Sequence, residues 1–172
     1  ALIAKFNYFT EDSQVTYSGI TDAERRNFGI RYNPFKNDTF DTERYGLSLT
    51  HNWDMNDAVN VSTSIYHNTF DRDWWRQSST TTDTQCNASY PLSGGLNFQQ
   101  QRAAGIAVDP DLCNSAQGRL RSFEATGIQQ TWSVEHQFSQ ATRNLFQAGW
   151  RYHGEDQDRL QVNATSPTGR TG

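Results

Sequence analysis

The chain has 172 residues and a formal net charge of −4, so it fits one ordinary domain and lacks the basic excess of a nucleic-acid-binding protein. Hydrophobic residues make up only 34%, but the 13% of aromatic residues argues against a disordered chain. No apolar run reaches about 18 residues, which excludes a transmembrane helix, and the first residues do not resemble a signal peptide. We therefore expect a mature or internal segment.

Five segments alternate between polar and apolar residues with a period of two, which predicts β-strands. They are residues 2–9, 43–53, 59–68, 127–138 and 144–155. In the second segment Leu47 and Leu49 share one face, and in the last Trp150 and Tyr152 do so. Each segment exceeds the usual soluble strand of about five or six residues.

The connections between these strands alternate in length. Residues 11–40 and 71–118 form long polar connections, whereas residues 54–57 and 139–143 form short ones. Outer-membrane barrels have short periplasmic turns and long extracellular loops. The pattern therefore predicts an all-β antiparallel transmembrane meander with long extracellular loops.

The cost of charge in lipid decides which face of the strands would meet the membrane. An arginine near the bilayer midplane costs about 2–4 kcal/mol, so the polar faces should line a wet lumen. Lipid would then contact the opposite face, which carries Leu47, Val61, Trp132 and Trp150. A soluble β-sandwich remains the alternative, and it would bury these four residues. The smallest barrels need about eight strands, so five strands predict a part of a larger barrel.

Several ordered motifs resemble the barrel of TonB-dependent outer-membrane transporters, particularly the ferric-citrate-type receptors. The first is Gly19-Ile20-Thr21-Asp22-Ala23, and the second runs from Asn33-Pro34 through Asp38 and Phe40 to Arg44. Residues 72–77, "RDWWRQ", are similar to the end of the next upward strand. Residues 118–128 and 151–172 resemble later strand and loop segments, so the resemblance covers nearly the whole chain.

The resemblance implies that residues 1–172 are part of the β-barrel domain of such a receptor, without its plug domain or its closing C-terminal strand. A full member would be a barrel of about 22 strands in the bacterial outer membrane. Its ligand would be a ferric siderophore or ferric citrate, and a TonB-type energy-coupling protein would act through the absent plug. Outer-membrane lipid and lipopolysaccharide would be further partners, with no nucleic acid, no cofactor and no enzymatic activity. A passive channel or a surface-binding barrel is the alternative function.

Arginines at the expected extracellular strand ends are the candidate ligand contacts, because the guanidinium group binds carboxylates at two points. They are Arg31, Arg44, Arg72, Arg76, Arg119 and Arg121, with Arg44 and Arg121 favoured and Gln77 as a weaker candidate. The alternative is that these arginines pair with Glu124, Glu155 or Asp156, or with lipopolysaccharide phosphates.

Trp74 and Trp75 follow the third predicted strand, and their side chains should point to opposite faces. We interpret them as part of the aromatic girdle, with ligand stacking or the corner of a soluble core as alternatives. Cys86 and Cys113 are the two cysteines of the chain. A disulfide between them predicts an oxidising compartment and at most about 3.6 kcal/mol of stabilisation, whereas two free thiols remain the alternative. The four histidines lack metal-ligand spacing, so no metal site is expected.

Overall fold

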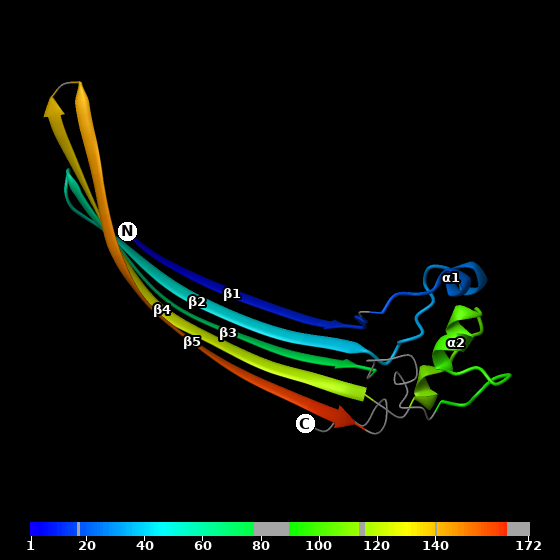
Figure 1. Ribbon diagram of the computed structural model, residues 1–172. Helices are drawn as coiled ribbons and strands as arrows, with labels where there is room; N and C mark the ends of the chain where they lie inside the picture. Colours follow the sequence, from blue (N-terminus) through cyan, green and yellow to red (C-terminus); the bar gives the residue numbers. More distant parts are fainter. Residues whose placement is uncertain (17, 78–89, 114–115, 140, 165–172) are drawn as a thin grey trace. The chain divides into compact units, whose positions relative to one another are not determined.

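The computed structural model describes residues 1–172 except 17, 78–89, 114–115, 140 and 165–172. Five antiparallel strands form one sheet whose strand order follows the chain (Figure 1). The strands are β1 (Leu2–Ser13), β2 (Thr39–Asn56), β3 (Val59–Arg76), β4 (Ala116–Ser139) and β5 (Thr142–Ala164). The helices are α1 (Asp22–Phe28), α2 (Phe98–Ala103) and the short 3₁₀ helix η2 (Pro110–Leu112).

All five predicted strands are confirmed, and so are the two short connections between β2 and β3 and between β4 and β5. The strands are longer than predicted, because β3 continues to Arg76, β4 starts at Ala116 and β5 reaches Ala164. Residues 71–76 of β3 and 116–118 of β4 come from the segment that the sequence pattern assigned to a long connection. Pairing with a neighbouring strand satisfies their backbone hydrogen bonds whatever the side chains are, so composition alone misplaced the strand ends.

The chain divides into two compact units. Unit 1 contains residues 1–10, 43–71 and 122–158, and unit 2 contains residues 11–42, 72–121 and 159–172. Among the described residues, unit 1 consists of strands and their turns, whereas unit 2 also contains the three helices.

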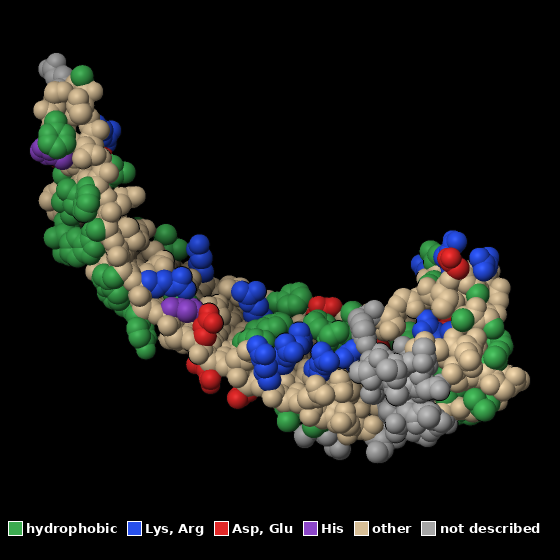
Figure 2. Space-filling model, in the orientation of Figure 1, with side chains coloured by type: hydrophobic (Ala, Val, Ile, Leu, Met, Phe, Trp, Pro, Cys, Tyr) green, Lys and Arg blue, Asp and Glu red, His purple; other side chains and the backbone are tan. Residues whose placement is uncertain are grey.

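The apolar face of unit 1 is largely uncovered. Leu47 is 57% exposed, Trp150 51% and Trp132 39%, whereas Val61 is buried. Figure 2 shows hydrophobic side chains at the surface of the strands. The described part of unit 1 has neither a helix nor a second sheet to cover this face. It therefore lacks the dry interior that a β-sandwich would place there.

Polar side chains that fall on the apolar face bond to one another. Gln130 donates from Nε2 to Thr63 Oγ1 at 3.0 Å, and its Oε1 accepts from the indole nitrogen of Trp132 at 3.0 Å. His67 Nδ1 lies 2.8 Å from the hydroxyl oxygen of Thr126. These cross-strand bonds reduce the cost of holding polar groups among apolar neighbours.

The opposite face of unit 1 carries rows of polar pairs between β2 and β3. The hydroxyl oxygens of Thr50 and Ser64 lie 2.6 Å apart, and Ser62 Oγ donates to Asn52 Oδ1 at 2.7 Å. Such pairs stabilise a sheet without forming an apolar core. The two faces therefore have the separate polar and apolar character that the period-two pattern predicted.

A hydrophobic cluster of buried residues lies in unit 2, outside the sheet. We call residues 19–38 and 90–113 the loop module. Its core contains Phe35, Phe98, Val108 and Cys113, and Tyr90 packs against them. The ring of Phe98 lies edge-on to the rings of Phe35 and Tyr90. The segments that the sequence pattern assigned to polar loops thus contain a small core of their own.

Both α-helices of the loop module begin with a capping box. Thr21 Oγ1 accepts from the backbone of Glu24 at 3.1 Å, and the Glu24 carboxylate accepts from the backbone of Thr21 at 2.7 Å. Asn97 and Gln100 make the same reciprocal pair at the start of α2. The caps satisfy backbone N–H groups that have no partner within the helix. This spacing is visible in the sequence and could have predicted both helices.

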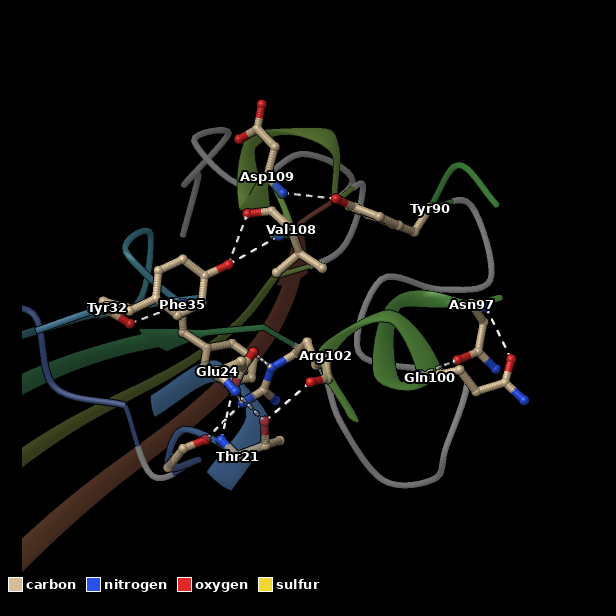
Figure 3. A network of polar contacts seen from close by, with 12 residues as sticks. Thr21, Glu24, Tyr32, Phe35, Tyr90, Asn97, Gln100, Arg102, Val108 and Asp109 are labelled. Carbon is tan, nitrogen blue, oxygen red and sulfur yellow. Dashed lines mark hydrogen bonds and ion pairs between the residues drawn. The ribbon is translucent and has the colours of Figure 1, made fainter. Parts of the chain in front are cut away.

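A buried ion pair joins α1 to α2 (Figure 3). Arg102 Nε donates to Glu24 Oε1 at 2.7 Å, and its Nη2 donates to Glu24 Oε2 at 3.0 Å. Arg102 also donates to the carbonyl oxygen of Gly19 and lies 4.5 Å from the centre of the Phe35 ring. Two-point pairing with further hydrogen bonds compensates for burying both charges. The pair therefore fixes how the two helices meet.

Within the described residues, no helix has the length and apolar composition of a membrane span.

Candidate anion-binding site

Four of the predicted arginines lie at adjacent ends of β3 and β4 in unit 2. We call Arg72, Arg76, Arg119 and Arg121 the arginine cluster. Arg76 Nη2 donates to Gln117 Oε1 at 3.4 Å, which places Gln117 on the same face of the sheet as Arg76. Because alternate residues of a strand share a face, Arg72 lies on this face of β3, and the other two arginines lie on this face of β4. Figure 2 shows Lys and Arg side chains gathered near these strand ends.

The surroundings of Arg72 disfavour its positive charge. Burial lowers the pKa of the Arg72 guanidinium, and the positive charges of Arg121 and Arg119 lower it further. Arginine stays protonated in proteins, so the lowered pKa reports an unfavourable electrostatic environment rather than a neutral side chain. An anion placed among these three groups would relieve their repulsion.

Two cluster arginines also bury donor atoms that have no partner. The Nε atoms of Arg72 and Arg119 are shielded from solvent, and neither makes a hydrogen bond within the described residues. Buried polar atoms are nearly always bonded in folded proteins, and an orphaned charged donor costs the most. These N–H groups can donate to a carboxylate or phosphate oxygen.

Three members of the cluster form no ion pair with a carboxylate of the described residues. None of the ion pairs formed there includes Arg72, Arg119 or Arg121. Two of the acids that the sequence offered as arginine partners face histidines instead. Glu124 lies 3.7 Å from His67 Nδ1, and Glu155 lies 2.7 Å from His153 Nε2. Asp156 does not pair with an arginine in this part of the structure either.

The two tryptophans lie on opposite faces and in different surroundings. Trp74 lies on the same face as the arginine cluster. The Arg76 guanidinium lies 5.3 Å from the centre of the Trp74 ring, and the indole nitrogen of Trp74 donates to the carbonyl oxygen of Val15. Trp75 is buried, and a Cβ atom added to Gly118 would meet its ring at 2.9 Å. Glycine at position 118 therefore gives the Trp75 ring room to lie against β4. Trp74 is the better placed of the two for ligand contact.

Gln77 lies beside the cluster as part of the support for the loop module. Its backbone nitrogen donates to Asp38 Oδ1 at 2.8 Å, and its side-chain nitrogen donates to Cys113 Sγ at 3.2 Å. Gln77 is buried, and its Oε1 has no hydrogen-bond partner in the described residues. Cys113 is disulfide-bonded, whereas Cys86, its expected partner, lies outside the described residues.

The two other predicted arginines are not members of the cluster. Arg31 is exposed in the loop module, between α1 and β2. Arg44 is exposed on β2 and belongs to unit 1, whereas Arg121, the residue favoured together with it, belongs to unit 2. The structure thus groups Arg121 with Arg72, Arg76 and Arg119.

Sequence reasoning did not identify Gln117, which orients Arg76. Strand alternation places Gln117 on the same face of β4 as Arg119 and Arg121, and this pattern is the signal that could have found it. The predicted strand began at residue 127, so it included none of these three residues. Within the described residues, no three His, Cys, Asp or Glu side chains form a group suited to a metal ion. The chemistry that the site offers is the binding of an anion by several guanidinium groups.

No family model and no curated protein matches the chain.

Proposed function

We propose that the chain forms part of the barrel of a bacterial outer-membrane receptor that imports a polyanionic ferric chelate. The chelate, ferric citrate or a carboxylate-bearing siderophore, binds to the arginine cluster from the extracellular side. A TonB-type protein then acts on a plug elsewhere in the receptor to drive import. The function is binding and transport rather than catalysis.

One observation indicates which class of ligand the site would bind. Arg72, Arg119 and Arg121 lie on one face of β3 and β4, and no carboxylate of the described residues pairs with them. The Nε donors of Arg72 and Arg119 are buried without a partner in the described residues. A ligand with several carboxylate oxygens supplies the missing acceptors and the missing negative charge. A neutral chelate supplies acceptors without the charge, so we expect it to bind more weakly.

The two faces of unit 1 support a barrel as the setting. An exposed apolar face on long strands suits contact with lipid, and the rows of polar pairs suit a wet lumen. The long extracellular loops of such a barrel would include the loop module.

Arginine substitutions in the whole protein test this function. We expect Arg72→Ala and Arg119→Ala each to weaken the binding of ferric citrate about 10- to 100-fold, because a hydrogen bond to a charged group contributes about 1.5–3 kcal/mol. Arg25→Ala is the matched control, since Arg25 is exposed on α1 and its nearest carboxylate, Asp22, lies 3.8 Å away. Isothermal titration of the detergent-solubilised protein measures the affinities.

The alternatives give different results. Unchanged affinity in both cluster variants would remove the arginines from the site. Equal affinity for ferric citrate and for a neutral ferric trihydroxamate would contradict the proposed ligand class. A passive channel would conduct anions without any saturable binding.

A further inference from the structure

A second cluster of polar side chains lies on the polar face of unit 1, and the anion-binding site does not use it. The hydroxyl oxygen of Tyr66 on β3 lies 2.7 Å from His153 Nδ1 on β5. His153 Nε2 lies 2.7 Å from Glu155 Oε1, and Arg151 Nε donates to the Tyr66 oxygen at 3.1 Å. We call Tyr66, Arg151, His153 and Glu155 the tyrosine–histidine cluster.

A glycine on the intervening strand makes this arrangement possible. Strand β4 lies between β3 and β5, so the Tyr66 side chain has to cross it to reach His153. A Cβ atom added to Gly127 would clash with the hydroxyl oxygen and Cζ of Tyr66. Glycine in a strand interior is unfavourable unless another group must approach the backbone closely. Gly127 thus gives the Tyr66 ring room to lie against β4, with its hydroxyl group directed to β5.

The hydrogen bonds define where the protons lie when His153 is neutral. Arg151 can only donate, so the Tyr66 oxygen accepts from it and the Tyr66 hydroxyl proton points to His153 Nδ1. His153 then carries its own proton on Nε2 and donates it to Glu155. The phenol oxygen and the Nδ1 lone pair therefore share one proton.

We propose that Fe(III), the cargo of the receptor, binds at this position in place of the shared proton. The Tyr66 oxygen and His153 Nδ1 each form a bond to iron, the phenol proton passes to water, and two oxygen ligands of the incoming complex leave the metal. The iron stays ferric, and oxygen atoms of the chelate fill the remaining positions. The choice of iron rests on the proposed function, whereas the pair of donor atoms does not.

The geometry fits such a pair of ligands. Neighbouring donors in an octahedral site with bonds of about 2.1 Å lie about 3.0 Å apart, close to the 2.7 Å between the two atoms here. A histidine that binds a metal usually donates its other N–H to a carboxylate, which is the position of Glu155. The His153 side chain is 26% exposed, so an ion on the polar face can reach it.

The test uses the whole protein in detergent micelles, titrated with Fe(III) supplied as its nitrilotriacetate complex. Tyrosinate bound to Fe(III) gives a charge-transfer band in the visible spectrum. We expect this band in the unsubstituted protein and its loss in Tyr66→Phe, which keeps the ring on Gly127 and removes only the hydroxyl group. Tyr152→Phe is the matched control and should keep the band, because Tyr152 is the β5 neighbour with the opposite strand parity and is 70% exposed.

Two further variants separate a metal site from a merely structural cluster. Glu155→Ala should lower the iron affinity about tenfold, because outer-shell partners orient the ligating histidine. Gly127→Ala should weaken the band without removing a donor atom, since it displaces the Tyr66 ring. Circular dichroism verifies that each variant retains its sheet.

Absence of the band in the unsubstituted protein, or the same band in Tyr66→Phe, would overturn the inference. Loss of the band in Tyr152→Phe would also overturn it. If the protein binds the chelate through its arginine cluster but shows no band, only the inferred iron site is contradicted. If it shows the band but has no affinity for an anionic chelate, only the proposed function is contradicted.

Discussion

Leu47 and Trp150 in unit 1 are 57% and 51% exposed, whereas Phe35 and Phe98 in the loop module of unit 2 are 1% and 4% exposed. The loop module buries its apolar side chains against one another, as a water-soluble domain does. Unit 1 buries few of them and satisfies its polar groups across strands instead. The difference shows that the loop module has an apolar core of its own, whereas the apolar face of unit 1 stays largely uncovered in the described residues.

The largest effect is expected from a substitution that disrupts the core of the loop module. Arg102→Ala leaves the Glu24 carboxylate buried without its partner, which should destabilise the module by about 3–5 kcal/mol. Hydrogen exchange of the whole protein measures this as faster exchange in residues 19–38 and 90–113, with little change in the strands of unit 1. Arg25→Ala, on an exposed side chain of α1, the helix that carries Glu24, serves as the control.

The double variant Glu24→Leu/Arg102→Met tests the physical reason. Replacing both charges with apolar groups removes the buried unpaired carboxylate, so much of the lost protection should return. Equally fast exchange throughout unit 1 in Arg102→Ala would show that the loop module does not open as a separate region.

A smaller effect tests the apolar face of unit 1. If this face meets lipid as proposed, Leu47→Arg places a charge in the bilayer and should cost about 2–4 kcal/mol. Ser48→Arg is the matched control, since the neighbouring residue points to the polar face and its substitution should cost much less. Denaturant unfolding of the protein in phospholipid vesicles gives both free energies. Equal costs for the two substitutions would contradict contact between this face and lipid.

The smallest expected effect concerns an exposed pair of the loop module. Lys36 donates to Asp111 at 2.8 Å, and this hydrogen bond, with a second from Asn37, lowers the pKa of the Asp111 carboxyl group. The same contact raises the pKa of Lys36. The stability that Asp111 contributes to the folded loop module is therefore present above the ordinary carboxyl pKa and is lost as the pH falls through the lowered pKa. The stability that Lys36 contributes is present below the ordinary lysine pKa and is lost as the pH rises through the raised pKa.

Hydrogen exchange around η2 should accordingly show slightly more protection at neutral pH than below about pH 3, after correction for the intrinsic exchange rates. Asp111→Asn should remove most of this difference. Exchange that changes with pH to the same extent in Asp111→Asn would assign the dependence to another group.

The alternation of residues determined most of what could be predicted for unit 1. Residues such as Leu47 and Ser48 are assigned to opposite faces by the period of a strand, and this holds whatever the neighbouring strand is. Strand ends were less predictable, because Arg119 and Arg121 belong to β4 only through pairing with its neighbours. The capping boxes of α1 and α2 were readable in the sequence, as Thr21 with Glu24 and Asn97 with Gln100, but the surrounding polarity favoured a loop.

By itself, the sequence determined the five strands, their two faces, the short turns and the arginines as the candidate residues. Local spacing decides these features, so they need no knowledge of distant contacts. Only the tertiary structure decided that Arg72 lies close to Arg119 and Arg121, and that Arg102 pairs with Glu24, 78 positions away in the chain. It also brought Tyr66 to His153 across Gly127, because such meetings depend on strand register and on loop packing.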